Sequence, residues 1–204
     1  IDGAPVEPDA AKAVEDAARG GSRLAATKAA QAEADAAPHG NSLEDIRAAL
    51  PALLPGQQED VFKAEQRFAK PDGYGMLFTN GTGTGKTWTG LGIVKRFALA
   101  GKTNTLIVAP NDKIIEDWQK SGRVLGLNIA RLQDTNDAGA GIVITTYANF
   151  GDNAALASRE WDLVVSDESH YLMQDKDGTP TSYLRSLRAI TLHPDGVYRR
   201  HEML

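Results

Sequence analysis

The chain has 204 residues, a formal net charge of −5 and no cysteine. This length suits one domain of ordinary size with an appendage, and the lack of cysteine excludes disulfides and thiolate metal sites. The negative charge argues against nucleic-acid binding driven by charge alone, although it allows a local basic track. Because the sequence shows neither a membrane-spanning apolar run nor a signal peptide, we expect a cytoplasmic protein with no membrane partner.

Residues 1–41 are dominated by Ala, Asp, Glu and Gly, and large apolar residues are scarce. The segments 11–18 and 24–37 have good helix propensity, but they lack an apolar stripe that could be buried. This pattern predicts a linker or marginal, solvated helices, and a partner-binding helix is the alternative interpretation. Since the first residue is Ile1, we expect the chain to be a piece of a longer protein.

The folded part is predicted to begin at residue 42 and to run to residue 204. Ser42 and Asp45 have the spacing of a capping box, and apolar residues follow at helical spacing until Pro51. Pro55 suits the first turn of the next helix. Two helices are therefore expected before the first strand.

A glycine-rich stretch, Asn-Gly-Thr-Gly-Thr-Gly-Lys-Thr, covers residues 80–87. It lies between a short apolar run, 76–78, interpreted as a buried strand, and a helical pattern over 88–100. A strand, a glycine-rich turn and a helix in this order form a phosphate-binding loop, because the backbone can curl and point several N–H groups at one anion. The alternative is a flexible loop with an incidental lysine. The predicted phosphate-binding residues are Gly81, Thr82, Gly83, Thr84, Gly85, Lys86 and Thr87.

Within this loop Lys86 is expected to reach the β- and γ-phosphates of a nucleotide, and the Thr87 hydroxyl is expected to bind Mg²⁺. Asn80 departs from the general pattern, which has glycine six residues before the lysine. The sequence matches instead the shorter form Gly-x-Gly-Lys-Thr.

Apolar runs alternate with helical patterns in the rest of the chain, which predicts a doubly wound α/β fold with a mostly parallel sheet and helices on both faces. In such sheets ligands bind at the carboxyl ends of the strands. A last helix is expected over 182–190, followed by a turn at 193–196. The predicted strands cover residues 105–110, 128–132, 141–147 and 162–166.

Two acids, Asp167 and Glu168, follow directly after the apolar run 162–166. Asp167 is expected to hold Mg²⁺ opposite Thr87, while Glu168 stays free to orient or deprotonate an attacking water. An Asp-Glu pair is common by itself. At the end of an apolar strand, downstream of the glycine-rich loop, it indicates hydrolysis of a nucleoside triphosphate with Mg²⁺ as cofactor.

The order of these motifs resembles that of superfamily 2 helicases and translocases over residues 43–175. Within that superfamily the glycine-rich loop, Ile-Thr-Thr-Tyr-Ala-Asn at 144–149 and Asp-Glu-Ser-His at 167–170 look most similar to strawberry-notch-like ATPases and to helicase modules of phage and plasmid polyproteins. The resemblance implies the first RecA-like ATPase lobe, in a bacterial, phage or plasmid context. It also implies that Gln57 recognises adenine and that His170 couples the ATP site to nucleic acid and to a second lobe. The residues that it implies for nucleic-acid contact are Asn111, Lys113, Thr145, Thr146 and Tyr147.

Simpler interpretations stay open for several of these residues. Gln57 could be a surface residue, Asn111 a helix cap, and Thr145 and Thr146 residues chosen for strand propensity. The helix over 182–190 carries arginines that suit a solvated face.

The resemblance implies nucleic acid as partner, DNA ahead of RNA, and a second RecA-like lobe elsewhere in the longer protein. The sequence contains no Ser-Ala-Thr motif and no arginine finger, a group that is worth about 10³–10⁵ in rate in such motors. We therefore expect this chain alone to bind nucleotide weakly and to hydrolyse it poorly. The alternatives are a nucleotide-binding scaffold or regulatory module without motor activity, and a different phosphate-loop enzyme such as a kinase, which the acid pair disfavours.

Overall fold

The computed structural model describes residues 8–35, 40–73, 75–79, 85–172, 179–191 and 201–203, and it describes side-chain surroundings from residue 19 to residue 191 within these ranges. Six strands form one sheet in the order β1-β6-β5-β2-β4-β3, and every described pair is parallel. The strands are β1 (Gly75–Met76), β2 (Thr105–Ala109), β3 (Ile129–Arg131), β4 (Ile142–Thr146), β5 (Leu163–Ser166) and β6 (His201–Met203).

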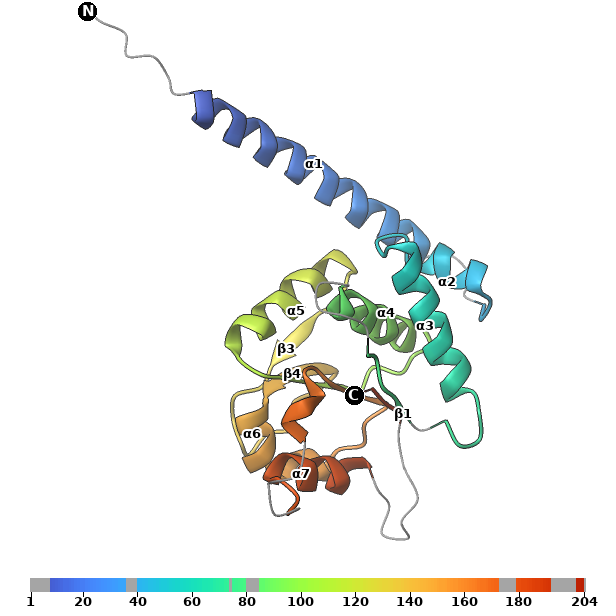
Figure 1. Ribbon diagram of the computed structural model, residues 1–204, viewed down its shortest axis with the longest axis vertical. Helices are drawn as coiled ribbons and strands as arrows, with labels where there is room; N and C mark the ends of the chain where they lie inside the picture. The colour runs from blue at the N-terminus through green and yellow to red at the C-terminus, as the bar shows by residue number, and fades with distance from the viewer. Residues whose placement is uncertain are drawn as a thin grey trace, which may run out of the picture.

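Helices cover both faces of the sheet (Figure 1). They are α1 (Pro8–Asp35), α2 (Leu43–Ala49), α3 (Pro55–Phe68), α4 (Lys86–Leu99), α5 (Asp112–Val124), α6 (Tyr147–Asp152) and α7 (Ser182–Thr191), with short 3₁₀ helices η1 (Ala154–Ser158) and η2 (Ser169–Leu172). None of the helices in the described ranges is long and apolar enough to cross a membrane.

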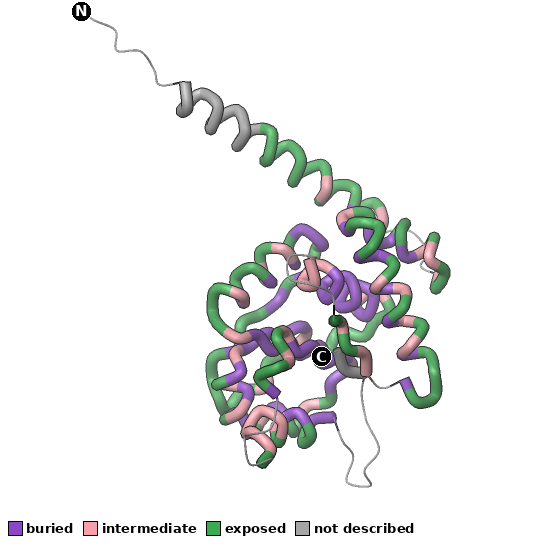
Figure 2. The backbone as a smooth tube through the Cα atoms, in the orientation of Figure 1, coloured by how far each residue is buried: buried purple, intermediate pink, exposed green. Residues whose placement is uncertain are grey.

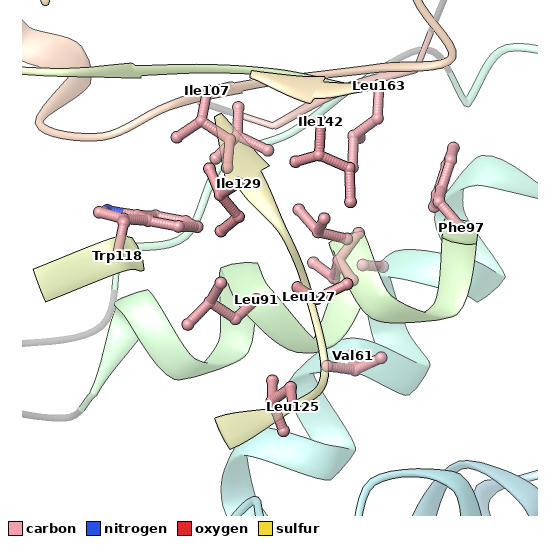
Figure 3. Packing of buried hydrophobic residues seen from close by; sticks show 14 of the residues in the cluster. Val61, Leu91, Phe97, Ile107, Trp118, Leu125, Leu127, Ile129, Ile142 and Leu163 are labelled. Atoms are coloured by element: carbon pink, nitrogen blue, oxygen red, sulfur yellow. The ribbon is translucent and has the colours of Figure 1, made fainter. Parts of the chain in front are cut away.

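Two hydrophobic cores lie on opposite faces of the sheet because side chains alternate along each parallel strand. Ile107 of β2 belongs to the first core, which α2, α3, α4 and α5 complete (Figure 3). Its neighbours Leu106 and Val108 belong to the second core, which α6 and α7 cover. The predicted doubly wound α/β fold is confirmed.

The starts of α2 and α3 lie where the sequence signals predicted them. The Ser42 hydroxyl accepts a hydrogen bond from the backbone N–H of Asp45 at 3.1 Å, and the Asp45 carboxylate accepts one from the backbone N–H of Ser42 at 2.9 Å. Helix α3 begins at Pro55. Both features confirm the predicted signals, which depend only on neighbouring residues.

The predicted buried strand over 76–78 is wrong in its extent. Strand β1 ends at Met76, and Leu77 is 58% exposed. Among the described strands β1 lies at the edge of the sheet and pairs only with β6. The residues that follow β1 therefore have a neighbouring strand on one side only. The predicted turn at 193–196 lies outside the described residues.

Residues 8–35 form one helix, α1, which projects from the lobe and is exposed over most of its described length (Figure 2). Its last turns pack on the lobe. The buried Gln31 amide donates to the carbonyl of Ala49 at 2.7 Å, and Asp35 pairs with Lys95 of α4. The prediction of a linker or of solvated helices for residues 1–41 did not anticipate these contacts with the lobe.

Helix α4 carries two buried cations, which need partners because burial removes their hydration. Lys95 pairs with Asp35 of α1, and Arg96 pairs with Glu65 of α3 at 2.6 Å. Arg96 also donates to the carbonyl of Gly40 at 2.7 Å. These bonds tie the N-terminal helices to the helix that follows the glycine-rich loop.

We expect Gly92→Ala to destabilise the lobe. A Cβ at Gly92 would lie 2.7 Å from Leu53 and 2.9 Å from Val61, so α4 and its neighbours would have to move apart. Overpacking of this kind costs about 1–3 kcal/mol in the free energy of unfolding, measurable by urea denaturation. Gly56→Ala is the matched control, because a Cβ at Gly56 meets nothing within 4 Å. Equal denaturation midpoints for the two variants would contradict the close packing.

Candidate active site at the carboxyl ends of the strands

The predicted catalytic residues come together at the carboxyl ends of the parallel strands. Lys86, Asp167, Glu168 and His170 line two neighbouring cavities, one of about 170 Å³ and one of about 560 Å³. The larger cavity also reaches Thr87. The structure therefore joins the start of α4 with the acids that follow β5, although 80 residues separate them in the sequence.

The glycine-rich loop enters the described structure at Gly85. Its φ of +78° is in the left-handed region, and a Cβ at this position would lie 2.3 Å from Nε2 of Gln57. Glycine is therefore required here for both conformation and space. Because α4 begins at Lys86, the unsatisfied N–H groups of its first turn belong to residues that line the larger cavity. The predicted phosphate contacts of Gly81, Thr82, Gly83 and Thr84 lie outside the described residues.

Asp167 is held at three points. Its backbone N–H donates to the carbonyl of Val108 at 2.9 Å, and its carbonyl accepts the hydroxyl of Tyr147 at 3.0 Å. Its carboxylate oxygen Oδ2 accepts the indole N–H of Trp118 at 2.8 Å. Trp118 was not among the predicted site residues. The missed signal is that a buried indole N–H is a donor that needs an acceptor.

Burial raises the pKa of Asp167 above its ordinary value of 3.8. The hydrogen bond from Trp118 and the charge of Lys86 oppose this rise, whereas the neighbouring charge of Glu168 adds to it. The ionised carboxylate is therefore under-solvated in the folded chain. A cation next to it would restore part of the lost stabilisation.

Glu168 occupies a strained turn beside Asp167. Its φ of 56° makes it the one non-glycine residue with positive φ in the described part of the chain. Strain of this size costs of order 1–3 kcal/mol and often marks functional sites. Its carboxylate lies 3.3 Å from Nδ1 of His170, and both side chains remain about half exposed at the cavity. Glu168 is thus accessible to water, as a group that acts on water must be.

Two of the residues predicted to contact nucleic acid are buried, which contradicts those predictions. Thr145 is fully buried, and its hydroxyl donates to the carbonyl of Leu132 at 3.0 Å. Tyr147 is 2% exposed, with its hydroxyl on the carbonyl of Asp167, and burial raises the pKa of this phenol far above its ordinary value. Strand β4 ends at Thr146, one residue earlier than predicted. Tyr147 therefore begins α6, and its side chain packs in the second core.

The other three candidates for nucleic-acid contact remain accessible. Thr146 is partly buried and caps α6, accepting the N–H of Asn149 at 3.3 Å. Asn111 caps α5, accepting the N–H of Ile114 at 3.1 Å, which confirms the capping interpretation. Lys113 is exposed on the first turn of α5. Contact of these residues with nucleic acid stays a prediction.

Gln57 is buried, so its interpretation as a surface residue is wrong. Its Oε1 accepts the backbone N–H of Leu54 at 3.0 Å, and its Nε2 donates to the carbonyl of Gly85 at 3.5 Å. The amide thus joins the start of α3 to the residue that caps α4. Recognition of adenine by Gln57 stays a prediction.

The predicted Mg²⁺ ligands fit a metal that arrives with a nucleotide. The described residues contain no group of three or more His, Asp or Glu that could hold a metal by themselves. Mg²⁺ is commonly bound by one or two carboxylates together with substrate phosphates. Asp167 and Thr87 line the same cavity and supply a carboxylate and a hydroxyl for this arrangement.

Residues 51–193 match the family model described as "Type III restriction enzyme, res subunit". Among solved structures the chain is similar to the Sulfolobus solfataricus SWI2/SNF2 ATPase core, once in complex with dsDNA (TM-score 0.56) and once as the core domain alone (TM-score 0.55). Identity is 18% in both cases, and the matches cover 73% of this chain and 31% and 30% of those chains. No curated protein matches. The likeness confirms the predicted RecA-like fold.

We expect Asp167→Asn to raise the stability of the metal-free chain at neutral pH. The asparagine has the same shape and carries no buried charge, and its oxygen can still accept the Trp118 N–H. Because the folded pKa of Asp167 is raised, its contribution to stability is greatest below the ordinary value of 3.8 and is lost as the pH rises through the folded pKa. The gain from the substitution therefore grows from acid to neutral pH.

Urea denaturation in a chelating buffer over this pH range measures the effect. Asp72→Asn is the control, because the Asp72 carboxyl lies exposed beside Arg67. A variant Asp167→Asn that is less stable than the natural chain at neutral pH would contradict an unfavourable buried charge.

Proposed function

We propose that this chain, which belongs to the type III restriction enzyme res-subunit family, is the ATP-binding lobe of a nucleic-acid-dependent ATPase of superfamily 2. In this proposal ATP hydrolysis is coupled to movement on nucleic acid, as in a helicase or a translocase. The observation that carries the proposal is the meeting of Lys86, Asp167 and Glu168 around one cavity at the carboxyl ends of the strands.

The proposed chemistry assigns roles to four residues that line the cavity, Lys86, Thr87, Asp167 and Glu168. Lys86 and the first N–H groups of α4 bind and neutralise the phosphates. Asp167 and Thr87 would hold Mg²⁺, which when bound supplies positive charge to the β- and γ-phosphates. Glu168 orients a water and accepts its proton as the water attacks the γ-phosphorus and the bond to ADP breaks.

The chain spans about a third of the length of the solved proteins that it matches. We therefore assign the remaining functions of a motor to a second RecA-like lobe, which would close over the cavity and supply the missing arginine. Glu168 and His170 line the cavity with exposed side chains, so they are available for contact with such a lobe. The transition-state charge would then be neutralised from both sides.

Nucleic acid is proposed to bind along the same edge of the sheet. Asn111 and Lys113 at the start of α5, together with Thr146 at the end of β4, offer polar and basic groups there. The similar SWI2/SNF2 core was solved in complex with dsDNA, which supports DNA ahead of RNA as the partner of this chain.

Substitution of Lys86 tests the nucleotide site. We expect Lys86→Ala to weaken binding of Mg·ATP by about 10- to 100-fold, because a hydrogen bond to a charged group contributes about 1.5–3 kcal/mol. Isothermal titration calorimetry measures this change. Lys102→Ala is the control, since the Lys102 ammonium lies over the Phe97 ring at 5.6 Å, outside both cavities. Equal affinities for Lys86→Ala and the natural chain would overturn the phosphate site.

The same titrations with Mg·GTP test Gln57. Tighter binding of ATP than of GTP supports recognition of adenine. Equal binding of the two nucleotides would leave the phosphate loop in place and reject that role for the Gln57 amide.

Replacement of Glu168 tests the proposed general base. In a protein that contains both lobes, Glu168→Gln should retain ATP binding and lose about 10²- to 10⁴-fold in DNA-stimulated hydrolysis. Release of phosphate with and without double-stranded DNA or RNA gives the measurement. Normal turnover by the variant would mean that Glu168 is not the base. Hydrolysis that neither nucleic acid stimulates would favour a nucleotide-binding regulatory module over a motor.

A further inference from the structure

We propose that Trp118 is a positioning residue for the metal-binding acid of this site: its indole N–H fixes the Asp167 carboxylate in the orientation that receives Mg²⁺. This inference rests on the proposed function, because it concerns the metal that arrives with ATP. The residue lies on α5, outside the motifs that carry the predicted chemistry.

The geometry is specific. Trp118 is 2% exposed, and its Nε1 lies 2.8 Å from Oδ2 of Asp167. Its ring packs in the first core beside Ile107 and Ile129 (Figure 3) and also lines the smaller cavity with Lys86 and Asp167. The indole is therefore immobilised by packing on one side and presents its polar atom to the site on the other.

The chemistry of the indole suits this role better than that of a charged donor. An indole N–H donates one hydrogen bond and carries no charge. It can hold a carboxylate in place while leaving the negative charge available to a cation. A lysine or arginine at the same position would neutralise Asp167 and compete with the metal.

The backbone of Asp167 is already fixed from two other elements, by the carbonyl of Val108 and by the hydroxyl of Tyr147. What these bonds leave undetermined is the rotation of the carboxylate about its side-chain bonds. Trp118 contacts the carboxylate itself and can restrict that rotation. Outer partners of metal ligands commonly act in this way, and their loss typically lowers metal affinity by about 10- to 100-fold.

Trp118→Phe removes the N–H and keeps an aromatic ring. ATP is titrated calorimetrically into the natural chain and the variant, once with Mg²⁺ and once in a chelating buffer. We expect the variant to lose about 10-fold in affinity with Mg²⁺ present and to match the natural chain without it. Equal Mg²⁺ dependence in the two proteins, or an equal loss under both conditions, would overturn the proposal.

Trp161→Phe is the matched control. Trp161 is equally buried, at 3% exposure, and its N–H donates to the carbonyl of Leu156 at 2.9 Å on the other face of the sheet. The control should lose a similar amount of stability and none of the Mg²⁺ dependence. A natural chain that binds no ATP under either condition would reject the proposed function, and this inference with it.

A measurement on the unsubstituted chain covers the case in which Trp118→Phe does not fold. The sequence has three tryptophans, so ¹⁵N-labelled protein gives three indole N–H signals. Paramagnetic Mn²⁺ added with ATP should broaden the Trp118 signal strongly and spare that of Trp161. An unaffected Trp118 signal in a chain that binds Mn·ATP would show that the metal does not lie at Asp167 beside the indole.

Discussion

The rest of the site depends on the burial of one carboxylate, that of Asp167. An ionised acid removed from water is unfavourable unless hydrogen bonds and opposite charge replace its hydration. Trp118, the backbone N–H of Glu168 and the charge of Lys86 each contribute, yet the pKa of Asp167 stays raised. The folded chain therefore retains an incompletely satisfied anion at the end of β5. We see in this the physical basis for attracting a cation together with a phosphate.

The arrangement of the sheet gives this anion its neighbours. Strand β6 lies between β1, which leads into the glycine-rich loop, and β5, which ends before Asp167. Since adjacent strands are about 4.8 Å apart, the chain segments that follow β1 and β5 leave the sheet about 10 Å apart. Lys86, at the start of α4, and Asp167, after β5, line the same cavity at this edge.

Sequence alone predicted the features that depend on local pattern, and it missed those that depend on packing. The Ser42 capping box, the helix start at Pro55 and the acids after β5 follow from residues close together in the chain. The bond between Trp118 and Asp167 joins residues 49 positions apart, and no periodicity encodes it. Tyr147 was misassigned because a hydroxyl at a strand end can face solvent or the core, and only the start of α6 decides between them.

The pairing of β1 has a consequence for the order in which the chain folds. Among the described strands, β1 at residues 75–76 bonds laterally to β6 at residues 201–203. During synthesis from the N-terminus, the strand that leads into the glycine-rich loop therefore waits for more than a hundred later residues before it gains its neighbour. Contacts between such distant segments form slowly because a long loop must close first. A nascent chain that ends before β6 would therefore leave β1, and the start of the loop that follows it, without this lateral neighbour.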